Sequence, residues 1–218
     1  SEMCIRDSYY IIRALGALVA IPFHEAGHAL AAWLLGDATA KREGRLSLNP
    51  FAHFDLLGTL CMVFAGVGWA KPVSTDPRNF KNPKQGMALT ALAGPVANLI
   101  LAYLAMVVWK LLYYWAPVND ATIFLALFLQ YLVYLDVSLA VFNLIPVPPL
   151  DGSKVLMMLL PYEKGMWMER HQQQLSLVLW ILILVGVLNV PLGYLSYWIM
   201  KFFTWATQWI GTLVQMVM

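Results

Sequence analysis

The fold class is decided by residues 9–35, YYIIRALGALVAIPFHEAGHALAAWLL, an apolar run with few ionisable side chains. An α-helix rises about 1.5 Å per residue, so roughly 20 apolar residues cross the hydrocarbon core of a bilayer. The whole chain is 61% hydrophobic and 12% charged, whereas soluble domains carry about 25% charged residues. Its mean hydropathy is +0.67. The sequence therefore predicts an all-α polytopic membrane protein.

Further apolar runs predict the other membrane helices. Residues 86–115 and 121–145 are each long enough to span, and residues 175–218 are long enough for two helices. Asn189, Pro191 and Gly193 are expected to form the turn that divides this last run. Together with residues 9–35, these runs predict about five transmembrane helices.

Residues 56–70 are apolar but short for a span, and three glycines interrupt them, which favours a re-entrant or interfacial segment. The alternating pattern of residues 44–48, GRLSL, predicts a short strand beside it, so a short re-entrant or β-hairpin segment is expected here in addition to the spans. If residues 56–70 do not cross, ten Lys and Arg residues fall on one side of the membrane and three remain elsewhere in residues 9–218. The positive-inside rule then makes the basic side cytoplasmic.

The domain organisation is simple. Residues 1–8, SEMCIRDS, fit neither a signal peptide nor a helix start and resemble a translated sequencing-adapter scar, so they are set aside. Residues 9–218 are expected to form a single membrane domain, with a core at 9–160 and C-terminal helices at 175–218. The net charge of +2 gives no sign of a nucleic-acid partner, and two cysteines do not suggest a disulfide framework.

The strongest chemical motif is HEAGH at residues 24–28. On a helix, residues four apart lie on one face, so His24 and His28 can reach one zinc ion at about 2.0–2.1 Å. Glu25 lies beside them, where it can take a proton from a water molecule held by the metal. Ionisable groups inside an apolar span are costly and point to function.

A third ligand is needed, because catalytic zinc usually has three protein ligands and one open position. The best candidate is Asp151 in NLIPVPPLDG, residues 143–152, where prolines end the preceding span. A carboxylate held there can face a metal at membrane depth. The same residue can also be read as the N-cap of a helix that starts near Gly152. Spacing alone leaves both interpretations open.

Three motifs in consistent order resemble the site-2 protease family: HEAGH, AGPVAN at residues 93–98, and NLIPVPPLDG. Residues 48–55, LNPFAHFD, and 68–73, GWAKPV, are similar to its compact prokaryotic branch. The resemblance covers about residues 10–160. It implies one Zn²⁺ per chain bound by His24, His28 and Asp151, with Glu25 as the catalytic base.

The resemblance also implies a zinc-dependent endopeptidase that cleaves transmembrane segments of other proteins. Such an enzyme is a multi-pass protein of the cell membrane, in contact with lipid, and its active site is reached from the cytoplasmic side. A locally unfolded substrate is expected to pair with the short strand near residues 45–48. The sequence does not indicate the oligomeric state.

Other polar residues are weaker candidates. Asn143 is expected either to bind the substrate backbone or oxyanion or to form an interhelical hydrogen bond. Asn98 and His53 are candidate substrate-binding residues, although structural roles are the simpler interpretation for both. Gly94 is interpreted as a site of close helix packing. Asp136, where the family tends to have Asn, has no assigned role.

Two other classes of function compete with the protease. In a metal-ion transporter or binding subunit, His24, His28 and Asp151 would form an ion site in a pathway, but such a site has no need of a base at Glu25. A catalytically inactive module that only binds membrane partners is the second alternative. The presence of Glu25 argues against it as well.

Overall fold

The computed structural model describes residues 2–53, 55–65 and 71–217, and every regular element in these ranges is helical. The long helices are α1 (Glu2–Leu34), α5 (Pro83–Trp115), α6 (Asp120–Asn143) and α10 (Asn189–Ala206). The shorter ones are α2 (Thr39–Arg42), α3 (Pro50–His53), α4 (Leu56–Ala65), η1 (Pro77–Asn79), α7 (Asp151–Leu159), α8 (Tyr162–Arg170), α9 (Gln172–Leu184) and α11 (Gln208–Val217). The all-α prediction is confirmed for this part of the chain.

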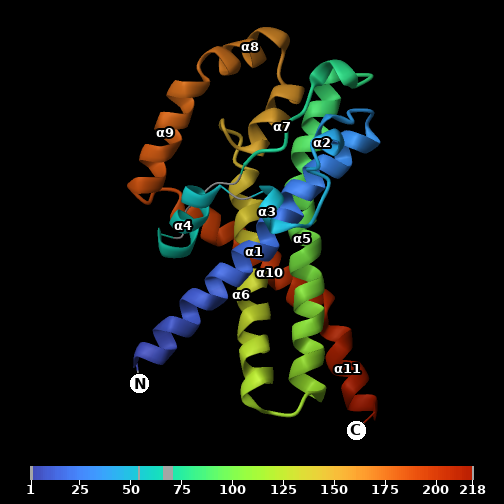
Figure 1. Cartoon of the computed structure of the whole chain (residues 1–218), viewed down its shortest axis with the longest axis vertical. Helices are drawn as coiled ribbons and strands as arrows, with labels where there is room; N and C mark the ends of the chain where they lie inside the picture. Colours follow the sequence, from blue (N-terminus) through green and yellow to red (C-terminus); the bar gives the residue numbers. More distant parts are fainter. Residues whose placement is uncertain (1, 54, 66–70, 218) are drawn as a thin grey trace.

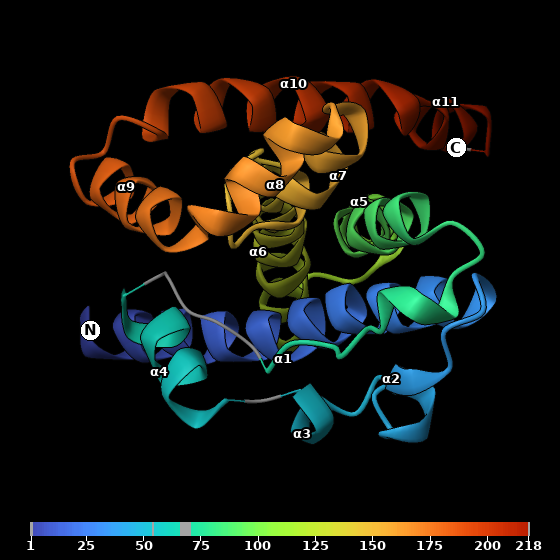
Figure 2. The same cartoon turned by 90° about the horizontal axis from the view of Figure 1, so that it is seen from above.

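The long helices form three layers. Figure 1 shows α5 and α6 as an antiparallel hairpin that α1 crosses diagonally. Seen from above, α1 lies on one side of this hairpin, and α10 with α11 lies on the other (Figure 2). The helix pairs α1 with α5, α5 with α6, and α10 with α6 are all in contact. The helices α7, α8 and α9 gather at one end of the hairpin.

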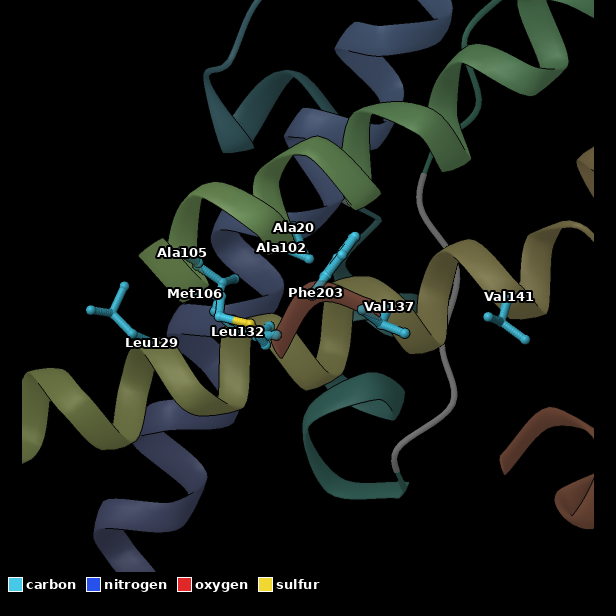
Figure 3. Close-up of a cluster of buried hydrophobic side chains, with 10 residues drawn as sticks. Ala20, Ala102, Ala105, Met106, Leu129, Leu132, Val137, Val141 and Phe203 are labelled. Carbon is cyan, nitrogen blue, oxygen red and sulfur yellow. The ribbon is translucent and has the colours of Figure 1, made fainter. Parts of the chain in front are cut away.

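The core lies where α1, α5, α6 and α10 meet (Figure 3). Small residues fill the closest approaches: Ala20 and Ala102 have no exposed surface, and Ala105 is 5% exposed. Larger side chains such as Val137 and Phe203 pack around them. Small residues at the contacts let helix backbones approach closely, which is the common way to pack helices in a membrane.

Specific end signals set the boundaries of the central hairpin. Asn82 caps α5 by accepting from the backbone N–H of Gln85, and Pro83 occupies the first turn, where its missing N–H costs nothing. Asn119 and Thr122 form a reciprocal capping box at the start of α6. These boundaries agree with the predicted helices within three residues.

The predicted strand at residues 44–48, and with it the β-hairpin, is wrong. These residues form a turn and a bend, and the structure contains no strand in the ranges it describes. The segment folds onto itself because its polar groups pair locally: the Arg45 guanidinium donates to the carbonyl of Ala52, and the Arg45 N–H donates to Ala40. Backbone groups paired in this way are no longer available to a strand partner.

The short apolar segment contains α4, which has ten residues and is therefore about 15 Å long, half of what a bilayer core requires. The helix alone cannot span. Residues 66–70, the remainder of the predicted re-entrant segment, lie outside the described residues.

The first helix, α1, begins at Glu2. The expectation that residues 1–8 do not start a helix is therefore wrong for residues 2–8.

The C-terminal apolar run is divided differently from the prediction. The turn lies at residues 185–188, where Gly186 has φ of +79°, a conformation that glycine adopts without steric cost. Pro191 and Gly193 fall inside α10, and Pro191 is tolerated there because the first turn of a helix has unpaired N–H groups anyway. A second break at Thr207 separates α10 from α11.

Two helices in the described residues, α5 and α6, are long and apolar enough to cross a membrane. The pair formed by α9 and residues 189–214, bent by 82°, makes a third if it counts as one span. The protein is therefore an α-helical membrane protein.

Candidate metal centre

Two histidine side chains converge one turn apart on α1. The Nε2 atoms of His24 and His28 lie 3.1 Å from each other, and the two imidazole rings are nearly perpendicular. Both residues are buried, with 9% and 8% of their surface exposed. This is the arrangement expected from the i, i+4 spacing on a helix.

Asp151 approaches the histidines from the other side of the site. The prolines after Asn143 end α6, and the chain turns back to begin α7 at Asp151. The Asp151 Oδ2 atom lies 3.2 Å from Nε2 of His24 and 3.2 Å from Nε2 of His28. The alternative in which Asp151 is the N-cap is wrong: Leu150 holds the cap position of α7 and makes no side-chain cap bond.

The three side chains fit a zinc ion. Among the described residues, these three form a group whose possible ligand atoms all lie within 4.8 Å of one another. Ligands at about 2.0–2.1 Å from a tetrahedral metal lie roughly 3.3 Å apart, close to the 3.1 and 3.2 Å separations here. Two nitrogens and one carboxylate oxygen also match the ligand types of catalytic zinc.

The hydrogen bonds around the ligands favour metal binding. Nδ1 of His28 donates to the backbone carbonyl of Thr90 at 2.7 Å. This bond places the ring proton on Nδ1 and leaves the lone pair of Nε2 directed at the site. The second oxygen of Asp151, Oδ1, lies 3.9 Å from the ammonium of Lys154. Nδ1 of His24 has no hydrogen-bond partner within the described part of the chain.

Gly94 of α5 borders the metal centre directly. A side-chain carbon at this position would overlap the His28 ring at Cε1 and Nε2 and lie 2.8 Å from Cε1 of His24. The interpretation of Gly94 as a helix-packing residue is therefore incomplete, because the glycine makes room for the ligands themselves. Its place in the AGPVAN motif was the available sequence signal.

Glu25 is held from the loop that follows the short apolar segment. It is 9% exposed, and its Oε2 accepts a hydrogen bond from the backbone N–H of Val73 at 3.2 Å. Sequence reasoning did not identify this contact, because a backbone donor leaves no mark on residue identity. The GWAKPV motif, which ends at Val73, was the only hint.

A cavity of about 950 Å³ opens onto the centre. Its walls come from α1, α5, α6, α7, α9, α10 and the loop around Val73, and apolar side chains dominate them, for example Leu139, Phe142, Ile183 and Leu192. Its volume is within the range of ligand-binding pockets. Glu25 and the three candidate ligands line this cavity.

The three weaker candidates, Asn143, Asn98 and His53, do not lie together at the cavity. Asn143 lines the cavity, and its Nδ2 donates to the carbonyl of Leu139 in its own helix. Asn98 and His53 are fully buried and are not among the described residues that line the cavity. His53 instead pairs through Nε2 with the carbonyl of Ser47, which stabilises the loop before α4.

Asp136 of α6 is buried and does not line the cavity. It has no exposed surface, and neither carboxylate oxygen has a hydrogen-bond partner among the described residues. Asn143 lies seven positions further along the helix, yet of the two only Asn143 reaches the cavity. The structure gives no account of why an acid occupies this position.

Comparison with known proteins identifies several relatives. The sequence profile of Peptidase family M50 matches residues 112–187. "Putative zinc metalloprotease YwhC" of Bacillus subtilis is 40% identical over 146 residues, which cover 66% of this chain and 67% of that protein. "Putative zinc metalloprotease Rip2" of Mycolicibacterium smegmatis is 30% identical over 201 residues, or 88% of this chain and 74% of that one. No solved structure matches the chain.

Proposed function

The chain belongs to peptidase family M50, the site-2 protease family, and is an intramembrane zinc-dependent protease, and we propose that His24, His28 and Asp151 hold the zinc while Glu25 is the general base. The observation that carries this assignment is the convergence of Asp151 Oδ2 on both Nε2 atoms at 3.2 Å, from a segment more than 120 residues away in the sequence. One zinc per chain is the occupancy that a single group of this kind supports.

The zinc, when bound, supplies Lewis acidity that polarises a peptide carbonyl and makes water easier to deprotonate. The protein residues supply the rest. Glu25 accepts the proton of the attacking water and passes it to the leaving amine. The Val73 N–H donates to one oxygen of Glu25, which restrains the carboxylate at the cavity. The Lys154 ammonium faces the oxygen of Asp151 that is turned away from the histidines.

The substrate is proposed to be a transmembrane segment of another membrane protein. The apolar cavity walls suit apolar side chains next to the scissile bond. A helical substrate hides its peptide groups in its own hydrogen bonds, so it has to extend locally before cleavage. One N–H of its Nδ2 is paired within α6, and Asn143 is proposed to accept a substrate N–H through its carbonyl oxygen.

The topology is proposed as follows. About five helices span the cell membrane, including α1, whose residues 9–35 are apolar and long enough to cross. The basic loops before α4 and before α5 lie on the cytoplasmic side. The metal centre, at the cytoplasmic ends of these helices, is reached from that side, where water can enter along the broken backbone at residues 146–150.

The decisive experiment is cleavage of a transmembrane substrate by the purified protein and by Glu25→Gln, with zinc content measured in both. Proteomics of membrane fragments from cells with either form can supply the substrate. Glutamine keeps the size of the side chain but removes the base, so zinc is retained and cleavage falls by about 10²–10⁴-fold. Undiminished cleavage by the zinc-loaded variant would remove Glu25 from the mechanism. Ion flux without any peptide product would favour the transporter alternative.

A further inference from the structure

Residues 71–76 form an extended segment that is anchored at both ends beside α1 (Figure 2). At the first anchor, the N–H of Lys71 donates to the carbonyl of His53 at 2.9 Å. At the second, the N–H of Asp76 donates to Oδ2 of Asp37 at 2.7 Å. Between the anchors, the segment lines the cavity and places the Val73 N–H against Glu25.

The second anchor is a buried carboxylate that accepts four hydrogen bonds. Asp37 follows the end of α1 and has no exposed surface. Its Oδ1 accepts from the N–H of Thr39 at 3.0 Å, from the Thr39 hydroxyl at 2.5 Å and from Nδ2 of Asn79 at 2.8 Å. Its Oδ2 accepts from Asp76. A charged acceptor with several donors makes strong, directional bonds.

These bonds do more than end a helix. The two bonds to Thr39 are local and would suffice to turn the chain after Gly36. The bonds to Asp76 and Asn79 instead reach across about 40 residues of sequence to the far end of the extended segment. Asp37 thus joins the helix that carries Glu25 to the segment that contacts Glu25.

We propose that Asp37 is a positioning residue for the protease reaction, which holds Glu25 in place through residues 71–76 and the N–H of Val73. The inference rests on the proposed role of Glu25 as the base. Only two residues lie between Val73 and Asp76, so a shift at the anchor moves the donor that faces the carboxylate. Misplacing a reacting group by about 1 Å can cost on the order of 100-fold in rate.

The first test compares Asp37→Asn with Thr39→Val in the full-length, zinc-loaded protein. Asparagine has one carbonyl oxygen, so it can keep the contacts at Oδ1 but turns an NH₂ group toward the N–H of Asp76. Valine at position 39 removes the hydroxyl, and with it the 3.3 Å bond that the hydroxyl accepts from Nδ2 of Asn79, but it leaves the bonds of Asp37 to Asp76 and Asn79 in place. We expect kcat to fall about ten- to a hundredfold in Asp37→Asn with KM and zinc content unchanged, and to stay within about twofold in Thr39→Val.

The second test removes the donor itself and does not depend on the stability of the anchor. Val73→Pro lacks the N–H that faces Glu25, whereas Val73→Ala keeps it. We expect Val73→Pro to reproduce the loss of kcat seen in Asp37→Asn, and Val73→Ala to retain more activity than Val73→Pro.

The two proposals can fail separately. If Asp37→Asn keeps the parental kcat, or if its zinc content falls together with kcat, Asp37 has no positioning role, while an inactive Glu25→Gln still supports Glu25 as the base. Equal activities of Val73→Pro and Val73→Ala would also overturn the inference. An active Glu25→Gln would overturn the proposed function first.

Discussion

Gly94 of α5 lies so close to His28 of α1 that a single added methyl group would overlap the imidazole ring. The bond from His28 Nδ1 to the carbonyl of Thr90, one turn earlier on α5, fixes the same ring from its other edge. The metal centre is therefore built by the packing of α5 against α1 as well as by its ligands. This arrangement leads to the first of four predictions.

Gly94→Ala is expected to lose most of the bound zinc. The methyl group has to displace His28 or separate the two helices, and overpacking of this kind costs about 1–3 kcal/mol of stability. Zinc analysis of the purified protein together with thermal unfolding measures both effects. Gly165→Ala in α8 is the matched control, since its nearest neighbour would be the Met157 carbonyl at 3.8 Å, and it should keep its zinc. Normal zinc content in Gly94→Ala would contradict the close contact.

Asp151→Ala is expected to lose zinc to a similar extent as His24→Ala or His28→Ala, because each removes one of the three proposed protein ligands. Asp120→Ala is the control for helix effects, since Asp120 is the first residue of α6 as Asp151 is of α7. An exposed acid at a helix N-terminus contributes only about 0.3–1 kcal/mol to stability, so Asp120→Ala should retain zinc and activity. Full zinc content in Asp151→Ala would show that another group completes the site.

Cysteine labelling in intact cells is expected to place Arg42 and Lys81 on the same, cytoplasmic side of the membrane. Single cysteines at these exposed positions, in a protein without its own cysteines, should be blocked from a membrane-impermeant maleimide outside the cell. A cysteine at Val118, which is 88% exposed in the turn between α5 and α6, should be labelled because α5 separates it from Lys81. Labelling of Arg42 and Lys81 from opposite sides would mean that residues 56–70 cross the membrane.

Asp37 is expected to make stability depend on pH in the acid range. Burial opposes its ionisation, but the hydrogen bonds from Thr39, Asn79 and Asp76 outweigh burial and hold the pKa of Asp37 below its usual value of 3.8. A carboxyl whose pKa is lower in the folded than in the unfolded protein stabilises the fold above the unfolded value and loses this contribution as pH falls through the folded value.

The measurement is thermal unfolding of wild type and Asp37→Asn in detergent from about pH 6 to about pH 3. Wild type should be the more stable at the upper end, and the difference should shrink toward the lower end. Both proteins contain His24 and His28, so protonation of these histidines affects both alike and cancels in the difference between their stabilities. A difference that stays constant over the range would show that folding does not lower the pKa of Asp37.

The sequence by itself determined the helical class and brought together two of the three candidate ligands. Hydropathy identified α5 and α6 because a helix pairs its own backbone groups and needs only an apolar surface to enter a bilayer. The i, i+4 spacing brought His24 and His28 together because that geometry belongs to any helix. Both inferences depend on local structure, so no knowledge of packing was needed.

The tertiary structure decided the remainder. It brought Asp151 to the histidines instead of leaving it as a helix cap, and it placed Asn143 at the cavity but His53 in a loop. It also replaced the strand expected at residues 44–48 with a turn. Contacts such as Gly94 with His28 and Val73 with Glu25 join distant segments through a missing side chain or a backbone N–H. Residue identity does not record such contacts, because they arise only when packed helices fix the distance between the segments.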